Sequence, residues 1–170
     1  MAFRRRSSPF TLLADGAIGV ELEGDARALL ASLPLQLSEL MTQRPDDPGL
    51  ARLSPPAYVS NAEAEAEYKR YTGDDLADRR RAQLEQLATT AGATRLDAAQ
   101  ADAWLTALNA LRLYLGTTLD VSEETEADDY ADEHDRAAFA LLHYLGGLQD
   151  LLLSAVAEGF PPPSVSEGGV

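Results

Sequence analysis

Residues 97–115 read DAAQADAWLTALNALRLYL, and this stretch decides the fold class. Asp97 and Gln100 have the spacing of a capping box, in which each side chain accepts a hydrogen bond from the backbone amide of the other residue. Large apolar residues then recur at spacings of three and four: Trp104, Leu108, Leu111 and Leu115. These spacings place one apolar stripe along a helix. The stretch therefore predicts a long core helix that ends near Gly116 and Thr117.

A second apolar helix is predicted towards the end of the chain. Large apolar residues recur there at spacings of three and four: Leu141, Leu145, Leu148, Leu152 and Val156. Further apolar surface comes from neighbouring positions: Phe139, Leu142, Leu151 and Leu153. A helix that is apolar nearly all round lies at the centre of a bundle or is covered by a second subunit. We expect this helix in the core, with a homodimer through it as a further expectation.

The start of the chain predicts a small β-hairpin followed by a helix. Asp15-Gly16 is a typical turn pair and lies between two short apolar runs within residues 10–22. A helix is then predicted from Gly24-Asp25 onwards, with leucines at helical spacing and a kink at Pro34. The chain therefore opens on a hairpin that leads directly into the first helix.

Two more helices are predicted between the first helix and residue 97. Prolines at 45, 48, 55 and 56 indicate a loop. Ser60 and Glu63 have capping-box spacing and predict a helix over about 61–71. Thr72-Gly73 predicts a break, after which a third helix runs from Asp74 to about Ala91. We expect residues 1–158 to form a single helical domain, a compact bundle of about five helices with the hairpin, and residues 159–170 to form a disordered tail.

Composition narrows the possible functions. The chain has 170 residues, no cysteine, and a formal net charge of -14 from 28 acidic and 14 basic residues. The missing thiols exclude disulfides and thiolate metal sites, and the charge disfavours nucleic acid and anionic membranes as partners. No secretory apolar region of 7 to 15 residues follows the basic N-terminus, and no unbroken apolar run approaches the roughly 20 residues of a membrane span. We expect a cytoplasmic protein.

Catalytic motifs are missing from the sequence. There is no P-loop, no dinucleotide-binding glycine pattern, and no His-Glu-x-x-His pair. The acidic residues of 120–135 together with His134 could form a divalent-metal site, but they lack the spacing of a calcium loop, so a solvated loop is favoured. His143 has no nucleophile partner in a recognised motif and is expected to be structural. We therefore predict no enzyme, no cofactor and no metal.

One segment resembles a helix-turn-helix and suggests DNA binding as an alternative. It consists of the helix over 61–71, the break at Thr72-Gly73, and a following helix that carries Arg79, Arg80 and Arg81. Electrostatics argues against DNA contact, because the first turns of that helix hold Asp74, Asp75 and Asp78. Three consecutive residues also span about 200° around a helix axis, so the three guanidinium groups cannot all point in one direction. Protein contact or ion pairing is the favoured role of the three arginines.

Two polar residues lie one turn apart on the strongly apolar helix over 97–115. Asn109 and Arg112 require hydrogen-bond partners wherever they are buried. A structural pair that fixes helix packing is the favoured interpretation. The alternative is a polar anchor at a protein interface, where arginine is enriched.

Several stretches together resemble a known family; they are 3–6, 50–58, 71–76, 103–116 and 144–149. Their most specific parts are Asn-x-x-Arg-Leu-x-Leu-Gly at 109–116 and Leu-Gly-x-Leu-Gln at 145–149. The family is an actinobacterial one catalogued as a domain of unknown function, commonly encoded beside the protease adaptor ClpS and including the oxidative-stress regulator AosR. The resemblance covers about 3–156.

The resemblance implies transcriptional regulation under oxidative stress, through contact with a sigma factor and without enzymatic activity. This chain differs from a redox sensor that works through a disulfide, because it contains no cysteine. Its net charge favours recruitment through a protein surface over operator binding. An adaptor role in Clp-type regulated proteolysis is the alternative that the genomic neighbour suggests.

Overall fold

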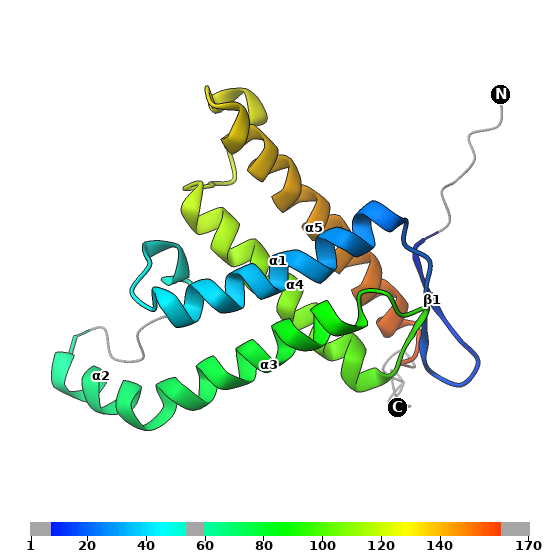
Figure 1. Ribbon diagram of the computed structural model, residues 1–170, viewed down its shortest axis with the longest axis horizontal. Helices are drawn as coiled ribbons and strands as arrows, with labels where there is room; N and C mark the ends of the chain where they lie inside the picture. The colour runs from blue at the N-terminus through cyan, green and yellow to red at the C-terminus, as the bar shows by residue number, and fades with distance from the viewer. Residues whose placement is uncertain (1–7, 54–59, 161–170) are drawn as a thin grey trace, which may run out of the picture.

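A computed structural model describes residues 8–53 and 60–160, with the side chain of Asp74 left out. At its centre is α4 (Ala98–Thr118), which packs against α3 (Asp74–Thr90) on one side and α5 (Glu133–Ala157) on the other. α1 (Gly24–Gln43) packs along α3 and crosses α4 (Figure 1). With α2 (Ala62–Tyr68), these elements give the five helices that the sequence predicts.

The core of the bundle is built around Trp104 on α4, which is fully buried. Its indole Nε1 donates a hydrogen bond of 2.7 Å to the Thr90 hydroxyl at the end of α3, and its ring meets Phe10 edge-on. Buried leucines from α4 itself and from the neighbouring helices complete this core: Leu30, Leu84, Leu87, Leu108, Leu145 and Leu152. The predicted stripe of α4 is confirmed. The last helix contributes one face to the core, as predicted, but its other face is not covered, since Leu151 and Leu153 are exposed.

The N-terminal hairpin is confirmed and is part of a larger sheet. β1 (Phe10–Leu12) pairs antiparallel with β2 (Ile18–Val20), and Gly16 supplies the positive φ of 85° at the turn. β2 also pairs antiparallel with β3 (Arg95–Leu96), in the link between α3 and α4. The third strand was not predicted, because two residues are too short to show an alternating pattern.

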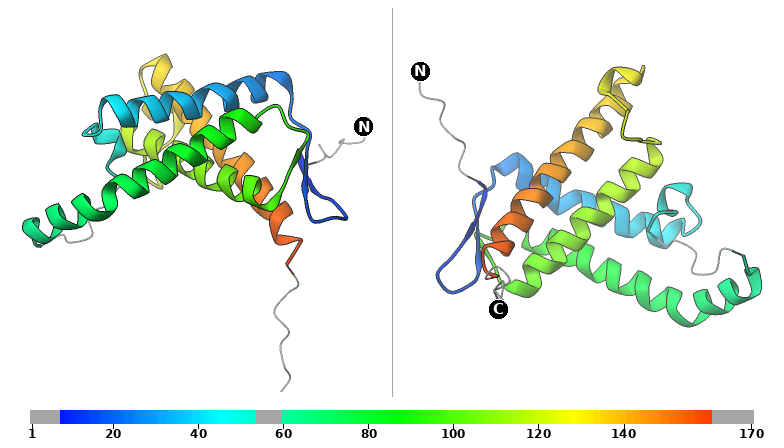
Figure 2. Two further views of the ribbon diagram at one scale, coloured as in Figure 1. Left: turned by 60° about the horizontal axis from the view of Figure 1, so that its bottom comes forward. Right: turned by 180° about the vertical axis from the view of Figure 1, so that it is seen from behind.

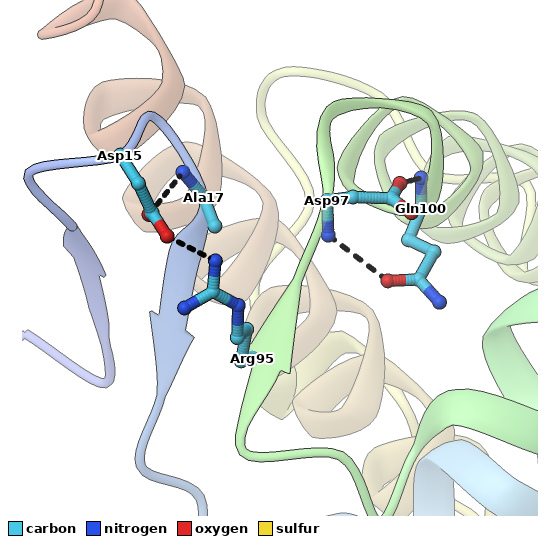
Figure 3. Close-up of polar contacts among 5 residues, drawn as sticks. All are labelled: Asp15, Ala17, Arg95, Asp97 and Gln100. Carbon is cyan, nitrogen blue, oxygen red and sulfur yellow. Dashed lines mark hydrogen bonds and ion pairs between the residues drawn. The ribbon is translucent and has the colours of Figure 1, made fainter.

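Side chains around β3 join the sheet to α4 (Figure 3). Asp15 in the hairpin turn accepts a hydrogen bond from the Ala17 amide and forms an ion pair with Arg95 of β3. These contacts lower the pKa of Asp15, the Arg95 hydrogen bond being the largest cause. Immediately after β3, Asp97 and Gln100 form the predicted capping box, with bonds of 2.8 and 2.9 Å.

The link between α1 and α2 holds a tightly packed glycine. It contains the short 3-10 helix η1 (Pro48–Leu50), in which the Asp47 side chain accepts a 2.9 Å hydrogen bond from the Gly49 amide. A Cβ at Gly49 would lie 2.5 Å from the Tyr114 ring of α4. Only glycine therefore fits here without movement of the ring. Two of the prolines that predicted a loop, Pro55 and Pro56, lie outside the described residues.

Two expectations for the region of α2 and α3 are wrong. The N-cap of α2 is Asn61, whose side chain accepts from the Ala64 amide, so the cap lies one residue after the predicted Ser60. No break occurs at Thr72-Gly73, because a π-helical segment η2 (Lys69–Gly73) joins α2 directly to α3. The helical rod from 62 to 90 projects past the bundle at its α2 end (Figure 1).

The acidic segment is mostly exposed, as predicted for a solvated loop, but it ends earlier than expected. A 3-10 helix, η3 (Ala127–Asp129), interrupts it, and the Tyr130 hydroxyl donates to the Leu119 carbonyl oxygen. α5 begins at Glu133, because the Asp132 side chain accepts a 2.6 Å hydrogen bond from the His134 amide. Of the predicted tail, the part from 161 onwards lies outside the described residues.

Candidate protein-docking groove

A groove of about 880 Å³ opens where the hairpin, the start of α1 and the second half of α5 meet. These three parts lie together at the end of the molecule opposite α2 (Figures 1 and 2). Its apolar surface includes Leu22, Leu29, Leu148 and Leu151, and three carboxylates also line it: Glu21, Glu23 and Asp25. Among the described residues that line the groove, none is a lysine, an arginine or a histidine. The groove is thus apolar and acidic.

The carboxylates come from five consecutive residues that turn from the sheet into α1. The Glu21 amide donates to the Pro9 carbonyl oxygen, which extends the hairpin pairing to the edge of the groove. Glu23 is the N-cap of α1, and Asp25 lies in its first turn, where a negative charge interacts favourably with the helix dipole. All three carboxylate residues are exposed. They are available to a partner in solution.

Arg27 holds this turn in place with its guanidinium. Nε donates to the Leu22 carbonyl oxygen at 2.9 Å, and Nη1 donates to the carbonyl oxygens of Ala91 and Ala93 at 3.1 and 2.9 Å. Nη2 makes a longer bond of 3.4 Å to the Val20 carbonyl oxygen. One half-buried side chain therefore joins β2, the start of α1 and the link between α3 and β3.

α5 supplies the opposite wall of the groove. Tyr144, Leu148 and Leu151 are spaced by four and three residues, so they lie on one face of the helix. Leu148 is buried, whereas Tyr144 and Leu151 are each about two-fifths exposed. Burial raises the pKa of the Tyr144 hydroxyl, and the negative charge of Glu23 raises it further. The tyrosine is therefore a neutral hydrogen-bonding group beside a carboxylate at neutral pH.

A second cavity, of about 430 Å³, lies between α1, α4 and the first half of α5. Its lining is mainly aliphatic and includes Leu37, Leu111 and Leu141, with His134 and Gln36 among its polar residues. His134 therefore lines an apolar cavity. No group of three or more acidic or histidine residues that could hold a metal ion occurs in the described parts of the chain.

His143 lies on the solvent side of α5. Its ring packs edge-on against Phe139 with the ring centroids 4.4 Å apart, and Phe139 in turn contacts Tyr130. These aromatic contacts fit the structural role expected for this histidine.

The predicted binding residues lie in two separate places, and neither is the groove. Arg79, Arg80 and Arg81 are on the projecting part of α3, where Arg81 forms an ion pair with Asp78 and burial lowers the pKa of Arg80. Because α2, η2 and α3 form one rod, these residues do not make the two crossed helices of a helix-turn-helix. The geometric basis for the DNA-binding alternative is absent from this segment.

Arg112 and Asn109 lie one turn apart on α4 but differ in exposure and contacts. Arg112 Nη1 donates a 2.6 Å hydrogen bond to the Gln149 side-chain oxygen of α5, whereas Asn109 is exposed. The guanidinium passes directly over Gly146, where a Cβ would lie 3.3 Å from Nε. Nε itself is buried without a partner among the described residues. The two most specific sequence segments, around Arg112 and around Gly146, therefore meet at the contact of α4 with α5.

The groove was missed at the sequence level, although one local signal was present. Three acidic residues flank Leu22 within five positions, which is an unusual density beside an apolar run. The apolar wall comes from α5, more than 100 residues later, and no local pattern links it to this turn.

α5 has a second property that depends on its composition. Within the described residues, it is a helix long and apolar enough to cross a membrane. Core helices of soluble proteins pass the same test. In this structure Leu145, Leu148 and Leu152 of α5 are buried in the core.

Comparison with known families gives one match. The family model described as "Domain of unknown function (DUF2017)" matches residues 5–156. No curated protein and no solved structure matches the chain.

Proposed function

We propose that this chain, which belongs to the DUF2017 family of domains of unknown function, is a non-catalytic regulatory protein that binds a basic, amphipathic segment of another protein in the groove between β2, α1 and α5. The observation that carries the proposal is the combination, within the described part of the chain, of an apolar lining with three carboxylates and no cationic side chain. A partner that covers the partly exposed Leu22, Leu29 and Leu151 gains affinity from apolar burial, and the carboxylates select for positive charge.

The chemistry of the partner follows from this lining. Leucine-sized side chains of a partner helix can enter the groove, while arginine or lysine side chains at its edge approach Glu21, Glu23 and Asp25. An exposed ion pair contributes about 0.2–1 kcal/mol, so three such pairs correspond to roughly a tenfold change in affinity. The charge also speeds association at low salt.

The resemblance to a family of unknown function that includes an oxidative-stress regulator supports transcription machinery as the source of the partner, with a sigma factor as the first candidate. Proteins of this class carry basic surfaces for DNA, and an acidic groove can take the place of the nucleic acid on such a surface. A chain without cysteine does not respond to oxidants through a disulfide. The proposed regulation is therefore a competition between the acidic groove and nucleic acid for the same basic surface of the partner.

The experiment measures binding of the purified chain to purified sigma factors and, separately, to promoter DNA. The groove variant Glu21→Gln with Glu23→Gln and Asp25→Asn should bind the sigma factor about tenfold more weakly than the wild type, with a smaller dependence on salt. Leu151→Ala should weaken binding at every salt concentration, because it removes apolar contact.

The matched control removes three charges from the exposed acidic loop instead: Glu123→Gln, Glu124→Gln and Glu126→Gln. The affinity of this control for the sigma factor should stay within about twofold of the wild-type value. A tenfold change requires about 1.4 kcal/mol, and charges far from the groove contribute much less than this. Equal losses in both variants would mean that net charge, and not the groove, governs binding. Tight DNA binding with a steep salt slope and no protein complex would overturn the proposal. A complex with Clp components in place of a sigma factor would favour the adaptor alternative.

A further inference from the structure

The α2–η2–α3 rod has a projecting part, residues 62–83, that we call the arm. None of its described side chains is buried, and the first buried residue of α3 is Leu84. Large apolar side chains are nevertheless exposed on the arm: Tyr71 is 72% exposed, Leu76 47% and Tyr68 37%. Exposure of three such side chains on one projecting helix indicates a surface for a protein partner.

The three apolar side chains are spaced by three and five residues. In a regular α-helix, a spacing of five would move the second residue away from the stripe. The π-helical segment at Lys69–Gly73 lies across this interval, and its wider turn takes up the additional residue. The eight residues from Tyr68 to Leu76 therefore correspond to about two turns, so these two side chains lie on one side of the rod, and Tyr71 lies in the π-helical turn between them.

Charged residues on the arm alternate in four blocks. Glu63, Glu65 and Glu67 are followed by the basic pair Lys69-Arg70, then by Asp74, Asp75 and Asp78, and finally by Arg79, Arg80 and Arg81. The blocks therefore run acidic, basic, acidic, basic from residue 62 to residue 83, and basic, acidic, basic, acidic in the opposite direction. The midpoint of this pattern lies near residues 72–73. An antiparallel copy of the arm consequently places each block opposite one of the other sign. A parallel copy in register would place like charges together.

We propose that the arms of two copies of this chain pair antiparallel about a twofold axis near Thr72 and Gly73. The occupant of the arm is thus a second copy, which the self-complementary charge pattern selects. Tyr71 of one copy meets Leu76 of the other on both sides of the axis, and the acidic α2 end of each arm lies beside the arginines of the other.

The existing ion pairs of the arm permit this exchange. Lys69 lies 3.7 Å from Glu65 and Arg81 pairs with Asp78 within one copy, and one partner of each pair is largely exposed, Lys69 at 62% and Asp78 at 67%. Exposed pairs along one helix contribute little by themselves. They can be shared with or replaced by pairs to the second arm.

The paired arms would be about 30 Å long, from 1.5 Å of rise for each residue. Such an interface is at the small end of specific contacts, so a weak dimer is expected. The arm and the groove lie at opposite ends of the molecule (Figure 1), so pairing leaves both grooves open. A dimer through α5 would instead cover Tyr144 and Leu151.

The first test reverses charge at each end of the arm. One variant carries Arg79→Glu and Arg81→Glu, and the other carries Glu63→Lys and Glu67→Lys. Each variant alone should sediment as a monomer at concentrations where the wild type is a dimer, because like charges now face each other. An equimolar mixture should recover a dimer with at least tenfold tighter association than either variant alone, since the opposite blocks match again.

Matched controls reverse the same number of charges elsewhere on exposed residues: Arg44→Glu with Arg136→Glu, and Glu123→Lys with Glu124→Lys. These should dimerise like the wild type. Circular dichroism of every variant reports whether the arm stays helical. A wild type that is monomeric at concentrations up to about 1 mM would overturn the proposal. Failure of the mixture to recover the dimer, with helicity intact, would do the same.

The second test uses the absence of native cysteine, which makes a single engineered cysteine a unique site for a spin label. In an antiparallel pair the axial distance between equivalent residues grows by about 3 Å for each residue from the centre. Labels at Thr72 should therefore be close, those at Glu67 about 17 Å apart, and those at Ala82 about 28 Å apart along the axes. Equal distances at all three sites would indicate parallel pairing and refute the proposal. Sigma-factor binding is measured separately, so loss of the dimer and loss of the groove function are distinguishable.

Discussion

Replacement of Arg27 by alanine is expected to lower stability and to loosen the groove while the rest of the bundle remains folded. The guanidinium donates four hydrogen bonds to backbone carbonyl oxygens, three of them between 2.9 and 3.1 Å and the fourth at 3.4 Å. A hydrogen bond from a charged donor contributes about 1.5–3 kcal/mol, but bonds from one side chain are not additive and water can reach part of the site. The expected loss is about 3 kcal/mol in the free energy of unfolding.

Urea unfolding followed by circular dichroism measures this loss. At a typical m-value of about 2 kcal/mol per molar urea, the midpoint should fall by about 1.5 M with an unchanged m-value. The melting temperature should fall by about 6–12 °C for a chain of this size. Arg27→Lys should recover only a minor part, because one ammonium group cannot reach carbonyl oxygens on three segments.

Hydrogen exchange adds a local test of the same reasoning. The Val20 amide, which donates to the Thr94 carbonyl oxygen beside the arginine, should lose protection in Arg27→Ala before amides in the middle of α4 do. The control is Arg44→Ala, whose arginine is exposed and pairs with Asp47 at 3.7 Å; it should change stability by less than about 0.5 kcal/mol. An Arg27→Ala protein as stable as this control would refute the idea that the guanidinium holds the turn.

Two further predictions concern local contacts. Gly146→Ala should destabilise the chain by about 1–2 kcal/mol, because its Cβ would lie 3.3 Å from Arg112 Nε, whereas Gly147→Ala, which has open space, should be neutral or stabilising in the same urea assay. The lowered pKa of Asp15 means that the fold favours its ionised carboxylate, so its contribution is present at neutral pH and is lost as the pH falls through the folded-state pKa. Amide protection in the hairpin should therefore decline in the acid range, and Asp15→Asn should remove that dependence; a titration curve that is the same in both proteins would contradict this.

The features that short sequence patterns encode were predicted correctly. The Asp15-Gly16 turn, the capping box of Asp97 and Gln100, and the stripe that begins at Trp104 each depend on residues within a few turns of one another. Local backbone chemistry determines such features, and tertiary contacts change them little. The order of the helices and the helical class of the fold follow from them.

Expectations that depended on a single local signal were less successful. Thr72-Gly73 reads as a break, yet the chain absorbs it as a π-helical turn within a longer rod. Ser60 and Asn61 are both good N-cap residues, and the hydrogen bond to the Ala64 amide selects Asn61. In both cases several backbone conformations have similar local energies, so the surrounding structure makes the choice.

The groove and the arm were decided by the tertiary structure. Arg27 looks like any surface arginine in the sequence, and only the folded chain brings the carbonyl oxygens of Ala91 and Ala93 to it across 64 and 66 positions. Tyr144 comes to lie beside Glu23 for the same reason.

Sequence by itself determined the helices, the hairpin, the absence of thiol chemistry and the strong negative charge, because composition and short-range spacing are sufficient for each. Which apolar side chains remain uncovered, and which charges surround them, depends on how helices far apart in the chain pack together. That packing is a property of the whole core, and no local pattern records it.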